Sequence, residues 1–260
     1  MSEAPQRKTL DFIGRSDNRF WWYQRPQNNY VPPIFQSMTD VEWSLMADWF
    51  LDTGKKFKSP GEISVPGISL LLGLISGNGI SRVVQCGHYA GYSTLLLGFA
   101  LARMGKNRAL WSVDIDRDMT DYTEAWIQLA NLSQIVKLEV MDSADKVCPE
   151  RAYEWLDGKP QIVFIDSSHM YEHTLRELEL WWNEIVPGGF LVLHDVSRFA
   201  KAFDASSNGG VLPAVQEWAA CMNLTPFLIN SFVDGNENAD DLPYQDGCGL
   251  GIVQKPWIRC

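Results

Sequence analysis

The sequence predicts an α/β fold in which a doubly wound, mostly parallel sheet of about seven strands is covered by helices on both faces. From Gly61 onward, short runs rich in β-branched and aromatic residues alternate with longer runs of helical periodicity. The short runs are apolar along their whole length, which is typical of strands buried on both faces. A chain of 260 residues, 46% of them hydrophobic, is long enough to bury one large core of this kind.

Residues 1–60 precede this alternation and are predicted to form an N-terminal helical and aromatic cap, whereas residues 61–260 are predicted to form the second domain. The cap contains the aromatic run FWWY at 20–23, the turn-forming VPP at 31–33 and a helix-like stretch, DVEWSLMADWF, at 40–50. Its aromatic side chains are expected either to line a small-molecule pocket or to fill a core or a subunit interface.

The second domain holds six candidate strands, with helical patterns between most of them. In sheets of this kind, ligands bind beyond the carboxyl ends of the strands, where the strand order reverses. The residues that directly follow each strand are therefore the candidate site. The candidate strands are RVVQC (82–86), ALWSV (109–113), VKLEV (136–140), QIVFI (161–165), FLVL (190–193) and GLGIV (249–253).

The composition excludes several classes of partner. A formal net charge of -10 opposes binding to nucleic acid and to anionic membranes, because both need a basic surface. No apolar run is long enough to span a bilayer, and the first residues do not resemble a signal peptide. The five cysteines form no metal-binding CxxC pair and are expected to be reduced thiols in a cytoplasmic protein.

The first candidate strand leads into the turn Q-C-G-H-Y-A-G-Y-S-T, in which Gly87 and Gly91 allow a ligand to approach the backbone closely. A purely structural strand-to-helix turn is the other interpretation. Neither the dinucleotide fingerprint G-x-G-x-x-G nor the nucleophile elbow G-x-S-x-G is present. The turn therefore favours neither a pyrophosphate cradle nor a serine nucleophile.

The next two strands each end in an acid. Asp114 stands 27 residues after the first glycine, where a carboxylate can accept hydrogen bonds from both hydroxyls of a ribose. A calcium loop does not fit, because Met119 and Ala125 replace the glycine and the glutamate that such a loop requires. Asp142 and Ser143, after the third strand, are expected either to bind the edge of an adenine or to cap the following helix.

The fourth and fifth strands each bring an acid and a histidine to the same edge. Asp166 and His169 lie in I-D-S-S-H, and His194 and Asp195 lie in L-H-D-V. Carboxylates placed together repel one another unless a functional partner offsets the repulsion. These four residues are therefore the candidate catalytic cluster, and His173, one helical turn further on, is a competing candidate base.

The order of these motifs resembles the class I S-adenosylmethionine (SAM)-dependent methyltransferases. Within that class it resembles the catechol O-methyltransferase type and relatives that methylate sugars and polyketides in antibiotic pathways. GHYAGYS is similar to the glycine loop of the family, SVDID to its ribose-binding acid and DSAD to its adenine loop. IDSSHMYE and PGGFLVLHDV are similar to the fourth-strand motif and to the turn and strand that follow it. The resemblance covers residues 61–196.

The resemblance implies a doubly wound methyltransferase fold of the Rossmann-like kind and assigns roles to residues. His169 matches the position of a catalytic base, and Asp166 and Asp195 match positions that ligate Mg²⁺ or another divalent cation in metal-dependent members. The segment GEIS, which ends at Ser64, would close over the cofactor. The implied cofactor-binding residues are Ser64, Gly87, Tyr89, Gly91, Ser93, Asp114, Asp142, Ser143 and Asp166.

The chain departs from the family pattern at two positions. Gln85 stands where many relatives have an acid, two residues before the first glycine. Val196 stands where metal-dependent members usually have a further Asp or Asn. His194 can replace that ligand only if the end of the strand twists.

The resemblance implies an O-methyltransferase that acts on a hydroxyl of a small molecule, an aromatic, polyketide or sugar natural product. The aromatic cap favours a ring-bearing acceptor, and its role as a subunit interface would make the protein a homodimer. Two other functions compete with this one. A nicotinamide-dependent oxidoreductase is disfavoured by the missing G-x-G-x-x-G, and a non-catalytic cofactor-binding partner is kept open by the two departures.

Overall fold

The computed structural model describes residues 31–230 and 246–257. The FWWY run at 20–23 lies outside the described residues. The described residues up to Pro60 form one compact unit, and the described residues from Gly61 onward form a second. No helix in the described ranges is both long enough and apolar enough for a membrane span.

The first unit contains helices α1 (Pro33–Gln36) and α2 (Asp40–Lys56). A capping box starts α2, because the Thr39 hydroxyl accepts a hydrogen bond from the Glu42 amide while the Glu42 carboxylate accepts one from the Thr39 amide. The helix predicted at 40–50 is therefore present. Its aromatic rings pack against each other and against α1, through the pairs Phe35–Trp43, Phe35–Phe50 and Trp49–Phe50.

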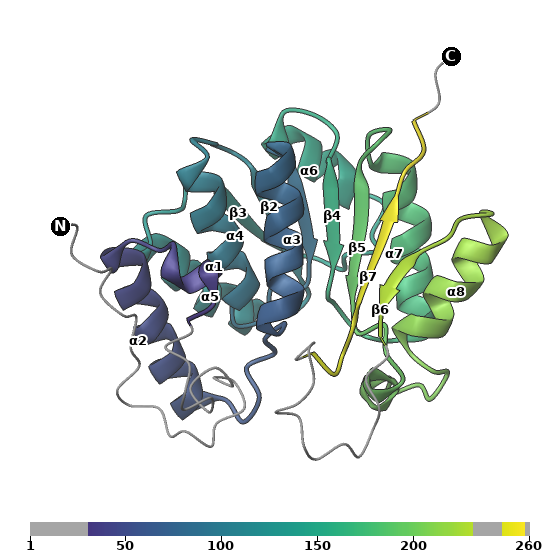
Figure 1. The fold of residues 1–260 in the computed structure, drawn as a ribbon, viewed down its shortest axis with the longest axis horizontal. Coiled ribbons are helices and arrows are strands. Elements are labelled where there is room, and N and C mark those ends of the chain that lie inside the picture. Colours follow the sequence, from purple (N-terminus) through teal and green to yellow (C-terminus); the bar gives the residue numbers. More distant parts are fainter. Residues whose placement is uncertain (1–30, 231–245, 258–260) are drawn as a thin grey trace. The chain divides into compact units, whose positions relative to one another are not determined.

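The second unit is built on a seven-stranded sheet with the order β3-β2-β1-β4-β5-β7-β6 (Figure 1). The pairs among β1 to β5 are parallel, and β7 is antiparallel to both β5 and β6. This confirms the predicted mostly parallel, doubly wound sheet. The strands are β1 (Val83–Cys86), β2 (Leu110–Asp114), β3 (Val136–Val140), β4 (Ile162–Ile165), β5 (Phe190–His194), β6 (Phe227–Ile229) and β7 (Leu250–Gln254).

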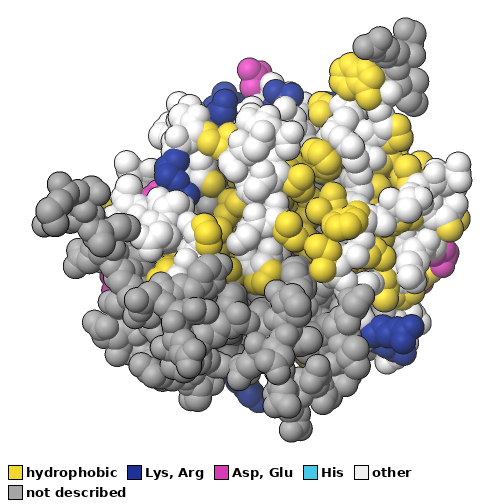
Figure 2. Space-filling view, in the orientation of Figure 1, with side chains coloured by type: hydrophobic (Ala, Val, Ile, Leu, Met, Phe, Trp, Pro, Cys, Tyr) yellow, Lys and Arg dark blue, Asp and Glu magenta, His cyan; other side chains and the backbone are white. Residues whose placement is uncertain are grey.

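Helices cover both faces of the sheet, with α3 and α4 in front of the strands and α6 and α7 behind them in Figure 1. The helices are α3 (Val65–Asn78), α4 (Tyr92–Arg103), α5 (Arg117–Leu129), α6 (Cys148–Leu156), α7 (Tyr171–Glu184) and α8 (Val211–Cys221), with a 3₁₀ helix, η2 (Phe199–Phe203). Hydrophobic side chains also show on the outer surface where β6 and β7 lie (Figure 2).

The back face of the sheet packs against α6, α7 and α8 through a core that contains four tryptophans. The ring centroids of Trp111 and Trp181 lie 6.2 Å apart, and those of Trp182 and Trp218 lie 5.2 Å apart, edge to face. All four side chains are buried. The pair Trp181 and Trp182 therefore belongs to the core.

Candidate active site

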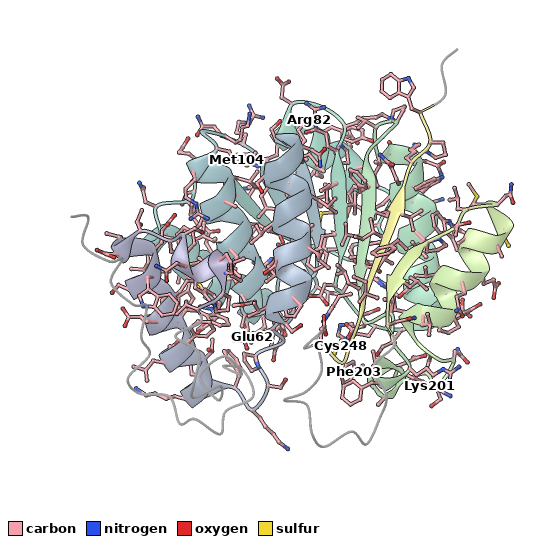
Figure 3. All side chains as sticks on the ribbon, in the orientation of Figure 1. Glu62, Arg82, Met104, Lys201, Phe203 and Cys248 are labelled. Carbon is pink, nitrogen blue, oxygen red and sulfur yellow. The ribbon has the colours of Figure 1, made fainter. Side chains whose placement is uncertain are left out.

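The candidate site lies at the carboxyl ends of the strands, around the point between β1 and β4 where the strand order reverses. Figure 3 shows Glu62, Cys248 and Phe203 at this end of the sheet and Arg82, which precedes β1, at the opposite end. Three of the eight described non-glycine residues with a positive φ follow strands here, namely Tyr89 (37°), His169 (58°) and Asp195 (61°). Such backbone strain is typically retained at functional sites.

Gly87 allows the turn after β1 to pass directly over the turn after β4. Its φ is +88°, and a Cβ atom would lie 2.0 Å from the backbone oxygen of Asp166. Gly91 begins α4 with a φ of +90°, and a Cβ atom there would lie 2.8 Å from Thr123. Both glycines are therefore required by backbone conformation and close packing.

Gln85, one of the two departures from the family pattern, is buried, and both ends of its side-chain amide make hydrogen bonds within the protein. Its side-chain amide donates to the Gly87 carbonyl oxygen (2.9 Å) and to the Ser93 hydroxyl (2.8 Å). Its side-chain oxygen accepts from the Thr94 hydroxyl (3.1 Å). Gln85 thus fastens the glycine turn to α4, and the buried Ser93 hydroxyl faces this support.

Asp114 ends β2 and holds the glycine turn through its carboxylate. One oxygen accepts from the amides of His88 (3.0 Å) and Tyr89 (2.8 Å), and the other accepts from the amide of Asp116 (3.0 Å). A carboxylate has about four acceptor directions, so one is left for a ligand hydroxyl. The Tyr89 ring packs on Gly61, where a Cβ atom would lie 2.9 Å away, so the segment GEIS begins against the turn.

Asp142 and Ser143 follow β3 but differ in what their side chains contact. Asp142 is half-buried and contacts the ring of His173, whose Nε2 lies 2.7 Å from its Oδ1. Ser143 is buried and donates to the Glu177 carboxylate (2.5 Å) on α7. Neither side chain caps α6, because Val147 is its N-cap and has no capping side chain. The helix-cap alternative is therefore wrong.

His173 lies between two carboxylates, away from the acid pair at the ends of β4 and β5. Its Nδ1 lies 3.2 Å from the fully buried Glu177, which also accepts from the Ser167 hydroxyl at 2.8 Å. Burial lowers the pKa of His173, but Glu177 and Asp142 raise it by more, so the net shift is upward. Burial raises the pKa of Asp142, but the Ala144 amide and His173 lower it by more. His173 therefore positions Asp142.

The four residues of the predicted catalytic cluster do come together. His169 Nε2 lies 3.1 Å from Asp195 and 3.7 Å from Asp166, and His194 Nδ1 lies 3.2 Å from Asp166 and 3.3 Å from Asp195. Asp195 follows β5 with a positive φ of 61°, and His194, the last residue of β5, lies beside both acids. The neighbouring Val196 is buried in the core and offers no ligand atom.

The acids and histidines of this cluster stabilise each other's charged forms. Burial raises the pKa of Asp166, but His194 and His169 lower it by more, so the net shift is strongly downward. Burial lowers the pKa of His169 and of His194, but the adjacent acids Asp166 and Asp195 raise both by more. His88, by contrast, is buried between Ser112 and Thr120, and burial lowers its pKa to about 4.

Two further residues of the site are not among those that the sequence predicts. Asp246 is buried, with Oδ2 3.7 Å from His194 Nε2, and its pKa is lowered because His194 outweighs the opposing effect of burial. The buried Ser64 hydroxyl also lowers the pKa of Asp246, so Ser64 lies beside this acid. Cys248 offers a sulfur within 4.8 Å of ligand atoms of His194 and Asp195. Both residues precede a strand, whereas the prediction covers only residues that follow strands.

The cluster has the donors that a divalent cation needs. Ligand atoms of Asp166, His169 and Asp195 lie within 4.8 Å of one another, and those of His194, Asp195 and Cys248 form a second such group. The buried His194 Nε2 has no hydrogen-bond partner among the described residues. The residues present therefore fit a metal ion.

Two aromatic side chains of η2 lie beside His169. Phe199 and Phe203 on η2 are 42% and 43% exposed, and their rings contact each other edge to face. The ring centroid of Phe203 lies 5.8 Å from that of His169. Exposed aromatic rings next to a polar cluster are typical of a small-molecule pocket.

Comparisons with known proteins agree with the fold that carries this site. Residues 84–196 match the family described as methyltransferase domain. The O-methyltransferase from Bacillus cereus in complex with S-adenosylhomocysteine is similar with a TM-score of 0.63 and 16% identity, over 84% of this chain and 93% of that chain. No match was found among curated proteins.

Two other solved structures are similar over comparable lengths. For the O-methyltransferase TomG from Streptomyces achromogenes, which is involved in tomaymycin synthesis and was solved with SAM, the TM-score is 0.59 at 15% identity, over 85% of this chain and 92% of that chain. For an S-adenosylhomocysteine-bound methyltransferase from Podospora anserina, the TM-score is 0.61 at 14% identity, over 85% of this chain and 89% of that chain. The chain therefore has the seven-stranded fold of the class I methyltransferases, and its residues 84–196 match a methyltransferase domain.

Proposed function

We propose that the chain transfers the methyl group of SAM to a hydroxyl oxygen of a small, ring-bearing acceptor. The observation that supports this most is the placement of His169. Its side chain is 33% exposed, whereas those of Asp166 and Asp195, which it contacts, are only 12% and 4% exposed. A base that is accessible on one side and held by buried acids on the other suits proton removal from an incoming hydroxyl.

The cofactor is proposed to lie across the turns that follow β1, β2 and β3. Gly87, Tyr89 and Gly91 would hold its methionine part, and the remaining acceptor direction of Asp114 would bind its ribose. Asp142 would face the adenine. Four further residues are proposed to support the cofactor site through the side chains that they contact. Ser64 contacts Asp246, and Ser93 contacts Gln85. Ser143 contacts Glu177, and Asp166 contacts His169 and His194.

When bound, SAM would supply a methyl group on a cationic sulfonium for in-line attack by the acceptor oxygen, and S-adenosylhomocysteine would leave as the C–S bond breaks. The acceptor must lose its proton, and the proposed atom that receives it is His169 Nδ1, the ring nitrogen that does not face the acids. Nε2–H of the ring points at Asp195 and Asp166, and these carboxylates would stabilise the resulting imidazolium. The protein otherwise contributes alignment and the exclusion of water.

A divalent cation is proposed to bind at Asp166 and Asp195. When bound, it would make the acceptor hydroxyl more acidic by Lewis-acid polarisation. The acceptor itself is proposed to stack on Phe203 and Phe199, which favours an aromatic or polyketide natural product over a free sugar. Residues 1–60 are proposed to be a cap domain that contributes to the acceptor pocket or to a homodimer interface.

Replacement of His169 tests the proposal. His169→Gln should lower the turnover number by about 10² to 10⁴ fold with little change in SAM affinity, because the residue acts only on the acceptor proton. The adjacent acids raise the pKa of His169, so the acidic limb of the wild-type pH-rate profile should lie above the ordinary histidine value and be absent from the variant.

The assay is the transfer of labelled methyl from SAM to a panel of phenols and alcohols. His88→Gln serves as the control, because the buried His88 ring contacts the hydroxyls of Ser112 and Thr120, whereas the His169 ring contacts Asp166 and Asp195. A His169→Gln variant that keeps wild-type turnover and its acidic limb would show that another group takes the proton.

A further inference from the structure

We propose that Cys248 and His194 are ligands of the metal site, so that the site takes a borderline transition ion such as Zn²⁺ or Co²⁺ in preference to Mg²⁺. This inference rests on the proposed divalent site at Asp166 and Asp195. It changes the donor set from oxygen alone to a mixture of nitrogen, oxygen and sulfur.

The topology brings the thiol to the acids. Because β7 runs antiparallel to β5, with His194 opposite Leu250, the residues that precede β7 meet the carboxyl end of β5. Cys248 stands two positions before β7 and reaches the same edge as Asp195. Figure 3 shows Cys248 at this end of the sheet.

The loop that carries Cys248 is held in one conformation. One oxygen of the buried Asp246 accepts from the Cys248 amide (3.0 Å) and the Gly249 amide (3.4 Å). Gly249 has a φ of +82°, and a Cβ atom there would lie 2.9 Å from the Ile229 carbonyl oxygen. The position of the thiol is therefore fixed by the backbone around it.

The side chains around His194 are mostly acidic and favour the binding of a cation. Asp166, Asp195 and Asp246 place three carboxylates around His194, and the side chain of each is at most 12% exposed. The second nitrogen of His194 is buried without a hydrogen-bond partner among the described residues. Three carboxylates close to one imidazole attract a cation, and a bound cation would take His194 as a neutral nitrogen ligand.

The donor types decide which ion binds. Mg²⁺ and Ca²⁺ are hard ions that take oxygen ligands, whereas imidazole and thiolate favour Zn²⁺, Co²⁺ and related ions. The two donor groups share Asp195, so its carboxylate links the β4 acid to the histidine and the thiol. A site with this composition should discriminate strongly against Mg²⁺.

Cobalt binding to the full chain provides a direct test. Co²⁺ titrated into metal-free protein should produce a near-ultraviolet thiolate-to-cobalt charge-transfer band, which Zn²⁺ displaces and equimolar Mg²⁺ does not. Cys248→Ser should abolish the band and weaken Co²⁺ binding by about tenfold or more. Cys221→Ser, at an exposed cysteine on α8, should leave the band and the affinity unchanged.

His194→Gln provides a second variant, in case Cys248→Ser does not fold by circular dichroism. It should keep the charge-transfer band but shift the visible cobalt bands and weaken binding. Absence of the band from wild type, its persistence in Cys248→Ser, or displacement by equimolar Mg²⁺ would overturn the inference. SAM affinity, measured separately by calorimetry, shows whether the proposed function fails independently of the metal.

Discussion

Asp114 combines a structural role with its proposed binding role. Three backbone amides, those of His88, Tyr89 and Asp116, already donate to its carboxylate. The bonds from the first two fix the glycine turn against the end of β2. Any change at Asp114 should therefore affect both a direct contact with the ribose and the shape of the turn that holds the methionine part.

Asp114→Asn should weaken SAM binding by about 30-fold or more, which corresponds to roughly 2 kcal/mol. The amide removes one charge-assisted acceptor and directs an N–H at donors of the turn. Isothermal titration calorimetry measures the change, and Asp118→Asn, at an exposed acid in the first turn of α5, is the matched control. Equal affinities for the two variants would exclude the proposed role of Asp114.

The stability contributed by His173 should depend on pH. Glu177 and Asp142 raise its folded-state pKa above the unfolded value, so its contribution is fully present below about pH 6.5 and is lost as the pH rises through the folded pKa. The difference in melting temperature between wild type and His173→Gln should accordingly shrink toward alkaline pH.

Thermal unfolding between about pH 5 and pH 9 measures this dependence. His88 supplies the comparison, because burial lowers its pKa to about 4. Its contribution is present above about pH 6.5 and is lost as the pH falls, so His88→Gln should show the opposite trend. A constant difference for His173→Gln would mean that its ring is not charged between the two acids.

At the scale of elements, the strands of the parallel part were predictable because both of their faces are buried, as in VVQC of β1. Strand β6 was not, since it has only three residues and Phe227 is 61% exposed. The antiparallel orientation of β7 could not be predicted either, because the pattern of an apolar run does not show the direction in which the strand pairs. Asp246 and Cys248 were missed for this reason, whereas the acids after β2, β4 and β5 were found.

Side-chain direction was the other part that sequence could not provide. DSAD indicates that Asp142 and Ser143 follow a strand, but only packing against α7 directs the Ser143 hydroxyl toward Glu177. Gln85 was identified as a departure from the family pattern, and its three hydrogen bonds, including those to Gly87 and Ser93, became visible only in the fold.

The glycines of the second unit should respond very differently to alanine. Gly87→Ala should prevent the turns after β1 and β4 from packing, because its Cβ would overlap the Asp166 carbonyl oxygen. Gly73 lies exposed in α3, and a Cβ atom there would meet nothing within 4 Å, so Gly73→Ala should stabilise the protein by about 0.5–1 kcal/mol. Denaturant unfolding compares the two, and tolerance of Gly87→Ala would contradict the close approach of the turns.

At the scale of the whole molecule, the proposed cofactor site joins the turns after three strands that are distant in sequence. Residues near 87, 114 and 142 meet only when the sheet order β3-β2-β1 is in place. A ligand that bridges these turns binds the folded state and not the unfolded chain. Ligand binding should therefore raise the stability of the second unit as a whole.

SAM at about 100 times its dissociation constant should stabilise the fold by roughly 2.7 kcal/mol, or about 5–10 °C in melting temperature for a unit of this size. NAD⁺ and NADP⁺ should produce no shift at equal concentration, because the turn after β1 lacks the G-x-G-x-x-G cradle for a pyrophosphate. Differential scanning calorimetry makes the comparison, with Asp114→Asn as the variant that should lose most of the SAM shift. A larger shift with a dinucleotide than with SAM would favour the oxidoreductase alternative, because the same strand ends would then be organised around a pyrophosphate.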